Sequence, residues 1–239
     1  MIDEQSPLPQ DHVGLLEGLT TTRSIRRYTD RAVTDEQLRA VMFAATRAPT
    51  GSNRQPFRFV VLADGPIAAQ AKRLIGRSAE GIWSEKRRRD GYDAGSGAHA
   101  DSPKSRMASS MEHYVDNFEK VPVLILPCMI RYRAPGSFEG ASIYPACQNI
   151  LLAARAVGLG GVFTGFHFAV ERELRDLIGI PDDALIAGTI TLGWPAGSQG
   201  PVRRRPLREL VYSDTWGNAP DWAVDPPGTR YTSAGPREG

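Results

Sequence analysis

Arginine and hydroxyl side chains gather near the N-terminus, in the run Thr-Arg-Ser-Ile-Arg-Arg-Tyr over residues 22–28. Guanidinium groups donate paired, charge-assisted hydrogen bonds that suit the oxygen atoms of a phosphate monoester. Such a phosphate carries about −1.5 to −2 charges near neutral pH, so several arginines are needed to neutralise it. The segment therefore indicates phosphate binding. A solvated basic loop is the alternative for this segment taken alone.

A second polar segment is Ala-Pro-Thr-Gly-Ser-Asn-Arg-Gln-Pro-Phe, over residues 48–57. Hydroxyl and amide side chains between Pro49 and Pro56 predict a rigid loop rich in hydrogen-bond donors and acceptors, which could read the edge of a heterocycle. A capped turn between a helix and a strand is the other interpretation, because Asn, Ser and Gly favour turns. A turn alone does not explain why both Asn53 and Gln55 are present.

The elements that must position these segments follow from local signals. Thr34 and Gln37 form a capping box, and the apolar stripe that follows predicts a helix that stops at Ala48-Pro49. Pro122 and Pro127 place their strand near the sheet edge. Further helices are expected over residues 11–20, 66–77, 141–157 and 171–178, and strands over 57–62, 121–130, 161–165 and 185–193.

Two segments differ in composition from the rest of the chain. Residues 78–118 are rich in charge, Gly, Ser and Ala, and predict helical pieces around a mobile stretch at 93–102. Their aromatic side chains suit either stacking on a flat substrate or ordinary packing. Residues 217–239 are rich in Pro and Gly and predict an extended tail. No linker divides the chain, so we expect a single domain over residues 1–239.

Composition excludes several classes of protein. Of the 239 residues, 41% are hydrophobic and 23% charged, as in globular proteins, and no apolar stretch approaches the length of a membrane span. The net charge of +2 is too small to indicate a polyanion partner, and the basic run at 86–89 lacks the interleaved aromatics of nucleic-acid sites. We therefore expect no membrane and no nucleic acid as partner.

The cysteines and histidines add further limits. The 2 cysteines are too few for a disulfide scaffold, and the polar start of the chain does not read as a signal peptide, so a cytoplasmic location is expected. The 4 histidines show no spacing typical of metal ligands, which predicts no metal site.

The two polar segments, in this order and spacing, resemble the FMN-dependent nitroreductase family. Arg-Ser-x-Arg-x-Tyr begins at Arg23, and Ala-Pro-Thr-x-x-Asn-x-Gln-Pro-Phe begins at Ala48. The resemblance continues through residues 158–166 and ends in Gly-Trp-Pro at 193–195 and the arginine run at 203–205. It covers roughly residues 18–212. The chain departs from the family where many members have an arginine at Thr22 and a second hydroxyl at Gly51.

The resemblance implies an α+β fold, a three-layer α/β/α sandwich with a mainly antiparallel central sheet, in a homodimer with an extended C-terminal tail. It implies bound FMN, NAD(P)H as electron donor, and reduction of a nitroaromatic or quinone-type acceptor by ping-pong hydride transfer through flavin N5. No side chain need be catalytic, because the cofactor carries the chemistry. Reductive dehalogenation, flavin breakdown or non-catalytic flavin sequestration are the alternatives on the same fold.

The resemblance also assigns residues to the cofactor. The phosphate and ribityl chain would be held near the arginine motif, the flavin would be lined by the Pro49–Pro56 loop of the other subunit, and two backbone N–H groups would face flavin N5. Residues 78–118 would cover the active site, and the tail at 217–239 would lie on the partner subunit. The cofactor-binding residues expected are Arg23, Ser24, Arg26 or Arg27, Arg203 and Arg205; Pro49, Thr50, Gly51, Asn53 and Gln55; and Thr164 and Gly165.

Overall fold

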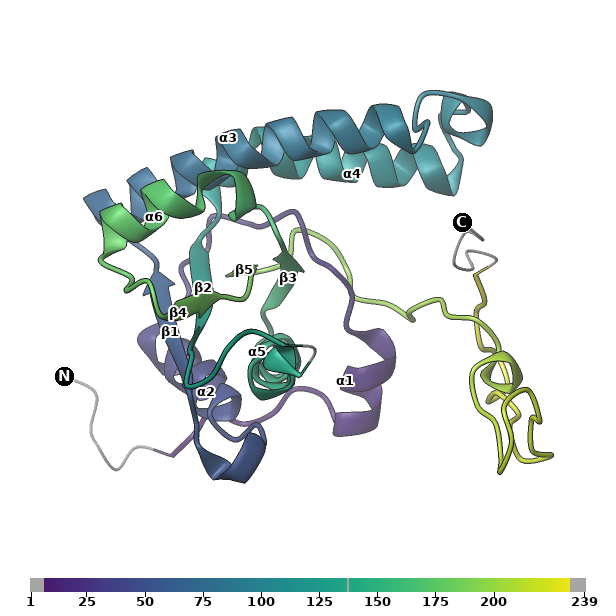
Figure 1. Cartoon of the computed structure of the whole chain (residues 1–239). Coiled ribbons are helices and arrows are strands. Elements are labelled where there is room, and N and C mark those ends of the chain that lie inside the picture. The colour runs from purple at the N-terminus through teal and green to yellow at the C-terminus, as the bar shows by residue number, and fades with distance from the viewer. Residues whose placement is uncertain (1–6, 137, 233–239) are drawn as a thin grey trace.

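Strand β2 (Val123–Ile130) forms the centre of the protein, because all of its side chains except the last are buried. In the computed structural model, which describes residues 7–136 and 138–232, β2 pairs with β1 (Phe57–Leu62) along one edge. Along its other edge it pairs with β4 (Ala184–Ile186) and β5 (Thr189–Gly193), and β5 pairs with β3 (Gly160–Thr164). Every one of these pairings is antiparallel, as predicted (Figure 1).

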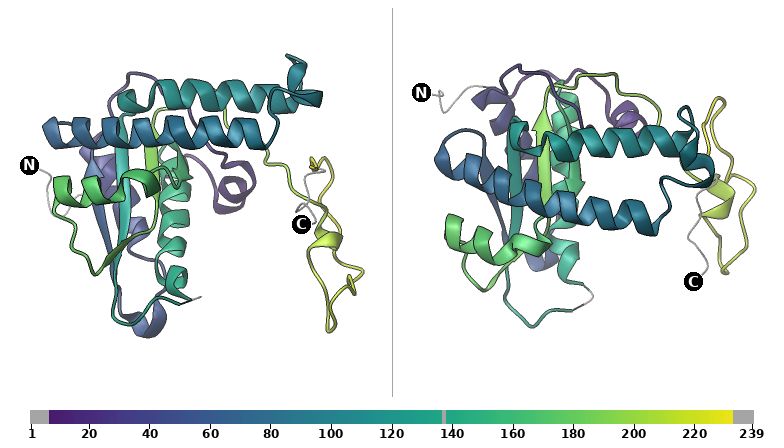
Figure 2. Two further views of the ribbon diagram at one scale, coloured as in Figure 1. Left: turned by 45° about the horizontal axis from the view of Figure 1, so that its top comes forward. Right: turned by 90° about the horizontal axis from the view of Figure 1, so that it is seen from above.

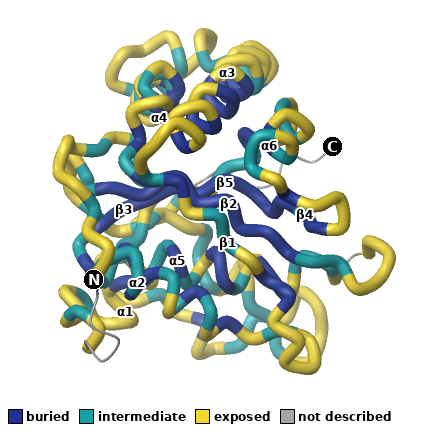
Figure 3. Tube along the Cα trace, turned by 90° about the vertical axis from the view of Figure 1, so that its left-hand side faces the viewer, coloured by how far each residue is buried: buried dark blue, intermediate teal, exposed yellow. Residues whose placement is uncertain are grey.

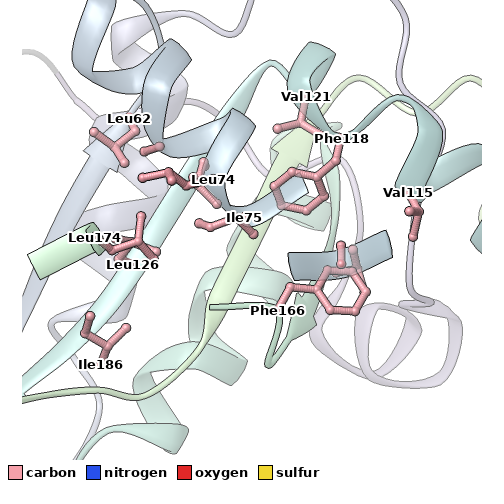
Figure 4. Close-up of a cluster of buried hydrophobic side chains, with 14 of the residues drawn as sticks. Leu62, Leu74, Ile75, Val115, Phe118, Val121, Leu126, Phe166, Leu174 and Ile186 are labelled. Carbon is pink, nitrogen blue, oxygen red and sulfur yellow. The ribbon is translucent and has the colours of Figure 1, made fainter. Parts of the chain in front are cut away.

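Helices cover both faces of the sheet and complete the predicted three-layer sandwich (Figure 3). One layer holds α3 (Pro66–Arg89), α4 (Pro103–Asp116) and α6 (Glu171–Ile178), and the other holds α1 (Leu15–Thr21), α2 (Asp35–Ala45) and α5 (Tyr144–Ala156). Successive side chains of β2 enter the two layers alternately. Leu124 and Leu126 pack with Ile75 and Phe118 (Figure 4), whereas Ile125 packs on the α2–α5 side.

The predicted edge position of β2 is wrong, because the strand is central. Pro127 is tolerated there because its neighbours on that edge are interrupted. The carbonyl of Pro127 accepts a hydrogen bond of 2.8 Å from Ala187 N, in the gap between β4 and β5. A residue's N–H and C=O point to the same side of a strand, so the missing N–H of Pro127 falls where the ladder is already broken.

The same gap corrects the single strand predicted over residues 185–193, which is two strands with the turn at Ala187-Gly188 between them. A Cβ atom at Gly188 would lie 2.4 Å from the Phe163 ring, so only glycine fits this turn. Helix α5 begins at Tyr144 rather than at residue 141, because Pro145 fits only in the first helical turn. The first helix begins at Leu15, after the extended Gly14, rather than at residue 11.

Helix α2 begins as predicted. Thr34 Oγ1 accepts a hydrogen bond of 3.2 Å from Gln37 N, and Gln37 Oε1 accepts one of 3.1 Å from Thr34 N. The capping box therefore fixes the start of the helix that leads into the Pro49–Pro56 loop.

Helices α3 and α4 form a long antiparallel hairpin that projects beyond the sheet (Figure 2). The predicted helix over 66–77 continues to Arg89, so the beginning of the charged segment, residues 78–89, belongs to this helix. Near the hairpin tip, Arg87 binds Asp93 at 2.8 Å and also pairs with Glu112 of α4. Tyr114 and Phe118 are each 1% exposed and belong to the core, which decides in favour of packing for these two aromatic side chains.

The C-terminal segment leaves the sandwich and lies apart from it (Figure 1). It contains a short 3-10 helix at Leu207–Glu209, and then returns so that Tyr231 pairs with Arg204. Trp216 is 93% exposed and Trp222 68%. Residues 1–6, and residues 233–239 of the expected tail, lie outside the described residues. Within the described ranges, no helix is both long and apolar enough to cross a membrane.

Candidate functional site

The arginine motif runs along the free edge of β3. Ser24 forms a bridge with Gly161, and Ile25 N donates a hydrogen bond of 2.9 Å to Gly161 O. The approach is close enough that a Cβ atom at Gly160 would lie 2.6 Å from Ile25. Because Gly160 and Gly161 carry no side chains, the motif can pack directly against the edge of the sheet at β3.

A buried hydroxyl cluster holds the motif in place. The Tyr28 hydroxyl donates to Ile25 O at 2.8 Å and lies 2.8 Å from Thr191 Oγ1. Thr191 Oγ1 is also 2.7 Å from the hydroxyl of Tyr114 in α4. Burial raises the pKa of both tyrosines, so both remain neutral hydrogen-bonding groups. The cluster joins the motif, β5 and α4.

A pocket of about 420 Å³ opens beside this motif. Arg26 points into it with Nη1 3.7 Å from Met107 Sδ of α4, while its buried Nε has no hydrogen-bond partner among the described residues. Desolvation lowers the pKa of Arg26, which means that the surroundings oppose its charge. No carboxylate contributes to the lining. The residues that line the pocket include Arg23, Ser24, Arg26, Gln148, Gly161, Arg203 and Arg204.

Gln199 is a neighbour of the pocket that the sequence did not single out. Its Oε1 accepts a hydrogen bond of 3.3 Å from Arg23 N, and its Nε2 is buried without a partner among the described residues. Two unpaired buried donors near several guanidinium groups fit the phosphate of FMN, because an anion supplies both charge and acceptors. Arg204 also lines the pocket, although the resemblance assigned only Arg203 and Arg205 of the arginine run to the cofactor.

The structure brings together only some of the predicted phosphate-binding residues. Arg23, Ser24, Arg26 and Arg203 share the pocket. Arg27 lines a different pocket, with Tyr92 and Asp93 near the tip of the α3–α4 hairpin. Arg205 lies beyond the pocket lining, and its Nε donates to Glu209 Oε2 at 2.7 Å. In this chain the phosphate-binding geometry therefore favours Arg26 over Arg27.

The Pro49–Pro56 loop lies near the N-terminal end of α5, where Gly51 N donates to Ser142 Oγ at 3.4 Å. Ser52, Asn53 and Gln55 have φ angles of 53°, 50° and 50°, in the left-handed region that is costly for residues other than glycine. Gln55 N donates to Thr50 Oγ1 at 3.0 Å, which helps to hold this strained turn. The loop lines a pocket of about 460 Å³ that shares no residue with the arginine pocket.

Thr164 is the last residue of β3, and Gly165 follows it directly. Thr164 Oγ1 lies 2.6 Å from Thr189 Oγ1 in β5, which fixes this end of the strand. A Cβ atom at position 165 would lie 2.4 Å from the Phe168 ring, so any larger residue would displace that ring. The end of β3 is therefore anchored to β5 and closely packed against Phe168.

His167, two residues further, is fully buried. Its Nε2 lies 3.1 Å from Ile186 O, whereas Nδ1 has no partner among the described residues. If Nε2 donates to that carbonyl, protonation of Nδ1 would create a buried N–H group without an acceptor. Burial accordingly lowers the pKa of His167. The neutral imidazole ring therefore links the segment after Gly165 to β4 through this hydrogen bond.

Other reactive groups do not form a second centre in the described part of the chain. Cys128 and Cys147 are free and buried, and burial raises their pKa values to about 11 and about 12. Both are therefore thiols near neutral pH rather than nucleophilic thiolates. Among residues 7–136 and 138–232, no group of three or more His, Cys, Asp or Glu side chains could hold a metal ion.

Comparison with known proteins agrees with this architecture. The profile described as the nitroreductase family matches residues 19–194. A protein of Archaeoglobus fulgidus, provisionally named NADH dehydrogenase/NAD(P)H nitroreductase, is 29% identical over 183 residues, which are 75% of this chain and 84% of that protein. An iodotyrosine deiodinase of Thermotoga neapolitana is 25% identical over 190 residues, which are 79% of this chain and 91% of the deiodinase.

Solved structures show the same fold. A provisionally assigned nitroreductase from Desulfovibrio desulfuricans, determined in complex with FMN, superposes with a TM-score of 0.59 at 28% identity. The match covers 84% of this chain and 96% of that one. The fold and the arginine-lined pocket beside β3 define a class of flavin-binding α+β oxidoreductases. The chain belongs to the nitroreductase family.

The buried His167 predicts a pH-dependent stability. Its pKa in the unfolded chain is about 6.5 and is lower in the folded protein, so the unfolded chain binds more protons between these two values. The stabilising contribution is therefore present above pH of about 6.5 and is lost as the pH falls towards the folded pKa, with a limiting slope of about 1.4 kcal/mol per pH unit. Urea unfolding of the wild type at pH 7.5 and 5.5 measures this loss.

The variant His167→Gln should show a smaller loss of unfolding free energy between these two pH values than the wild type. The exposed His99 offers a matched control, and His99→Gln should retain the wild-type difference. An unchanged pH dependence in His167→Gln would show that this histidine does not set the slope.

Proposed function

We propose that this protein binds FMN and uses NAD(P)H to reduce nitroaromatic or quinone-type acceptors in a ping-pong reaction. The observation that carries the proposal is the arginine pocket, where a desolvated Arg26 with an unpaired Nε faces a cavity lined by further guanidinium groups and no carboxylate. A basic groove that bound no anion would leave that desolvation uncompensated. The relative solved with FMN supports the same assignment.

The residues of this chain would divide the work of binding and orientation. Arg23, Arg26 and Arg203 hold the phosphate, and the Ser24 hydroxyl adds a hydrogen bond. As the family resemblance implies, the backbone at Thr164 and Gly165 would supply N–H groups to flavin N5. FMN, when bound, supplies the hydride transfer itself. The side chains therefore bind, orient and exclude water.

We further propose that each site is shared between two subunits of a homodimer. In one chain the Pro49–Pro56 loop and the arginine motif line separate pockets, which supports a site where the loop meets the flavin of a neighbouring molecule. Leu15 and Leu16 of α1 are 72% and 77% exposed, and Trp216, directly before the tail, is 93% exposed. Exposed apolar side chains of this size are typical of an interface that a partner covers.

The α3–α4 hairpin is proposed to cover the cofactor. Met107 of α4 already lines the arginine pocket, and the hydroxyl of Tyr114 in α4 reaches the cluster that holds the motif. The hairpin therefore has a fixed base beside the phosphate end and a tip, held by Arg87, that projects beyond the sheet (Figure 2).

The purified protein should show the visible spectrum of oxidised flavin, and NADPH should bleach it. Nitrobenzene or a benzoquinone should then restore the spectrum and sustain steady-state oxidation of NADPH. Parallel initial-rate lines at varied donor and acceptor would establish the ping-pong order. Bound flavin without turnover would instead favour flavin sequestration, and consumption of the flavin itself would favour flavin breakdown.

A dehalogenase is the second candidate, favoured by the similarity to the iodotyrosine deiodinase. The same sample offered 3-iodotyrosine distinguishes the two. Release of iodide with no reduction of nitrobenzene or quinone would replace the nitroreductase proposal.

Phosphate recognition by Arg26 predicts a difference between FMN and riboflavin. The variant Arg26→Gln should raise the dissociation constant for FMN by about tenfold, as expected for the loss of a charge-assisted hydrogen bond, and change riboflavin binding by less than twofold. Its neighbour provides the control, because Arg27 lines a different pocket and Arg27→Gln should leave both constants unchanged. Titration by flavin fluorescence quenching measures all four constants. Equal weakening of both ligands would contradict the phosphate assignment.

The tail predicts a link between dimerisation and flavin binding. Deleting residues 217–239 should shift the protein from dimer to monomer in sedimentation velocity, with loss of bound FMN. The milder double variant Trp216→Ala/Trp222→Ala should weaken the dimer in the same direction. A monomer that keeps one FMN per chain would refute the shared site.

A further inference from the structure

A second positively charged recess lies near the N-terminal end of α5, separate from the arginine pocket. It has a volume of about 460 Å³, and its polar and aromatic lining includes Thr50, Arg54, Tyr132, Arg133, Phe138 and Ser142. None of the lining residues is acidic. The recess joins the Pro49–Pro56 loop to the segment that connects β2 with α5.

Two guanidinium groups form cation–π contacts with one aromatic ring in this recess. The Cζ atom of Arg54 lies 4.9 Å from the centroid of the Tyr132 ring, and that of Arg133 lies 5.4 Å from it. Within residues 7–136 and 138–232, neither guanidinium group forms an ion pair or donates a side-chain hydrogen bond. The neighbouring carboxylate, Glu139, is already bound by Arg131 Nε at 2.6 Å.

Local structure constrains both arginines, although both are exposed. Arg54 is flanked by Asn53 and Gln55, both with φ of 50°, so the strained turn sets the direction in which its side chain leaves the backbone. Cation–π contact with Tyr132 adds about 0.5–1 kcal/mol at an exposed site. Two positive charges held against one ring without a counter-ion repel each other, so binding of an anion between them is favourable.

We propose that this recess is a subsite for the anionic group, a phosphate or a carboxylate, of a ligand whose flat ring enters the flavin site. The inference rests on the proposed function, which brings the Pro49–Pro56 loop to the flavin of the partner. Arg54 and Arg133 bind the anionic oxygens, and Tyr132, whose ring both guanidinium groups contact, holds the two arginines together. The subsite selects charged ligands over neutral ones of the same shape. The anion belongs either to the acceptor or to the dinucleotide donor.

The acceptor arm of the test compares 4-nitrobenzoate with nitrobenzene, which lacks the carboxylate. On the FMN-loaded protein, Arg54→Gln and Arg133→Gln should each raise the KM and the equilibrium dissociation constant for 4-nitrobenzoate by about tenfold. The constants for nitrobenzene should change by less than twofold. Arg77, exposed on α3 in the other layer, provides the matched control, and Arg77→Gln should behave as wild type.

The donor arm compares NADPH with 1-benzyl-1,4-dihydronicotinamide, a hydride donor without phosphate. If the anion is that of the donor, both variants should raise the KM for NADPH by about tenfold and leave the phosphate-free donor unchanged. An effect in either arm supports the subsite and identifies the source of its anion. Equal changes for charged and neutral ligands in both arms, or no change in either, would overturn it.

The dissociation constant for 4-nitrobenzoate, measured by calorimetry without donor, separates this inference from the function on which it rests. A protein that binds FMN and discriminates 4-nitrobenzoate through Arg54 and Arg133 but does not oxidise NADPH would retain the subsite and lose the proposed reaction. A protein that turns over neutral and charged acceptors alike, with no change in the variants, would retain the reaction and lose the subsite.

Discussion

The arrangement of the phosphate end depends on the electrostatics of one residue, Arg26. Its guanidinium group is partly withdrawn from water, its Nε has no acceptor among the described residues, and desolvation lowers its pKa. A charge in such a place is unfavourable unless an anion completes it. The surrounding elements nevertheless hold the Arg26 guanidinium group in this position. Tyr28 fixes the loop that carries Arg26 to β5, and Met107 and Tyr114 bring α4 against it.

The loop at Pro49–Pro56 stores a different form of unfavourable energy. Three residues other than glycine adopt left-handed backbone angles within four positions, each at a cost of order 1 kcal/mol. Hydrogen bonds from Gln55 N to Thr50 and from Gly51 N to Ser142 hold the turn against that strain. Strain at one loop and desolvation at the other occur beside two separate pockets. The proposed function would relieve both through partners outside the single chain, an anion in one case and a neighbouring flavin in the other.

Local signals predicted much of the fold. The capping box at Thr34, the strand at residues 57–62 and the helix at residues 171–178 were predicted from neighbouring residues alone, and the structure confirms them. The sequence failed where distant segments decide. Pro127 indicated an edge strand because the rule assumes a continuous neighbour, and the break at Ala187-Gly188 lies about sixty residues away in sequence. The extension of α3 to Arg89 depends on packing against α4, since Trp83 is buried although its helix is highly charged.

The candidate site likewise contains some residues that local sequence indicates and others that only the structure reveals. Arg23, Ser24 and Arg26 were recognisable because their types are clustered in sequence, and the structure places them in one pocket. Gln199 was not recognisable, because a single glutamine in a Gly- and Pro-containing loop carries no signal until it is seen beside Arg23. The hydroxyl cluster of Tyr28, Tyr114 and Thr191 joins residues up to 163 positions apart, and no local pattern indicates it.

These features together explain how one fold can serve several reactions. The proposed phosphate end is built from the sheet edge, the base of the hairpin and the hydroxyl cluster, in which Tyr114 and Thr191 are buried. The groups free to discriminate among ligands lie elsewhere, on the strained loop and the segment after β2, where Arg54, Tyr132 and Arg133 are exposed. Because the cofactor supplies the electron transfer, substitutions at these exposed positions can change the preferred ligand without disturbing the cofactor's own anchorage. The proposed subsite would therefore make selectivity a property of the surface loops rather than of the core.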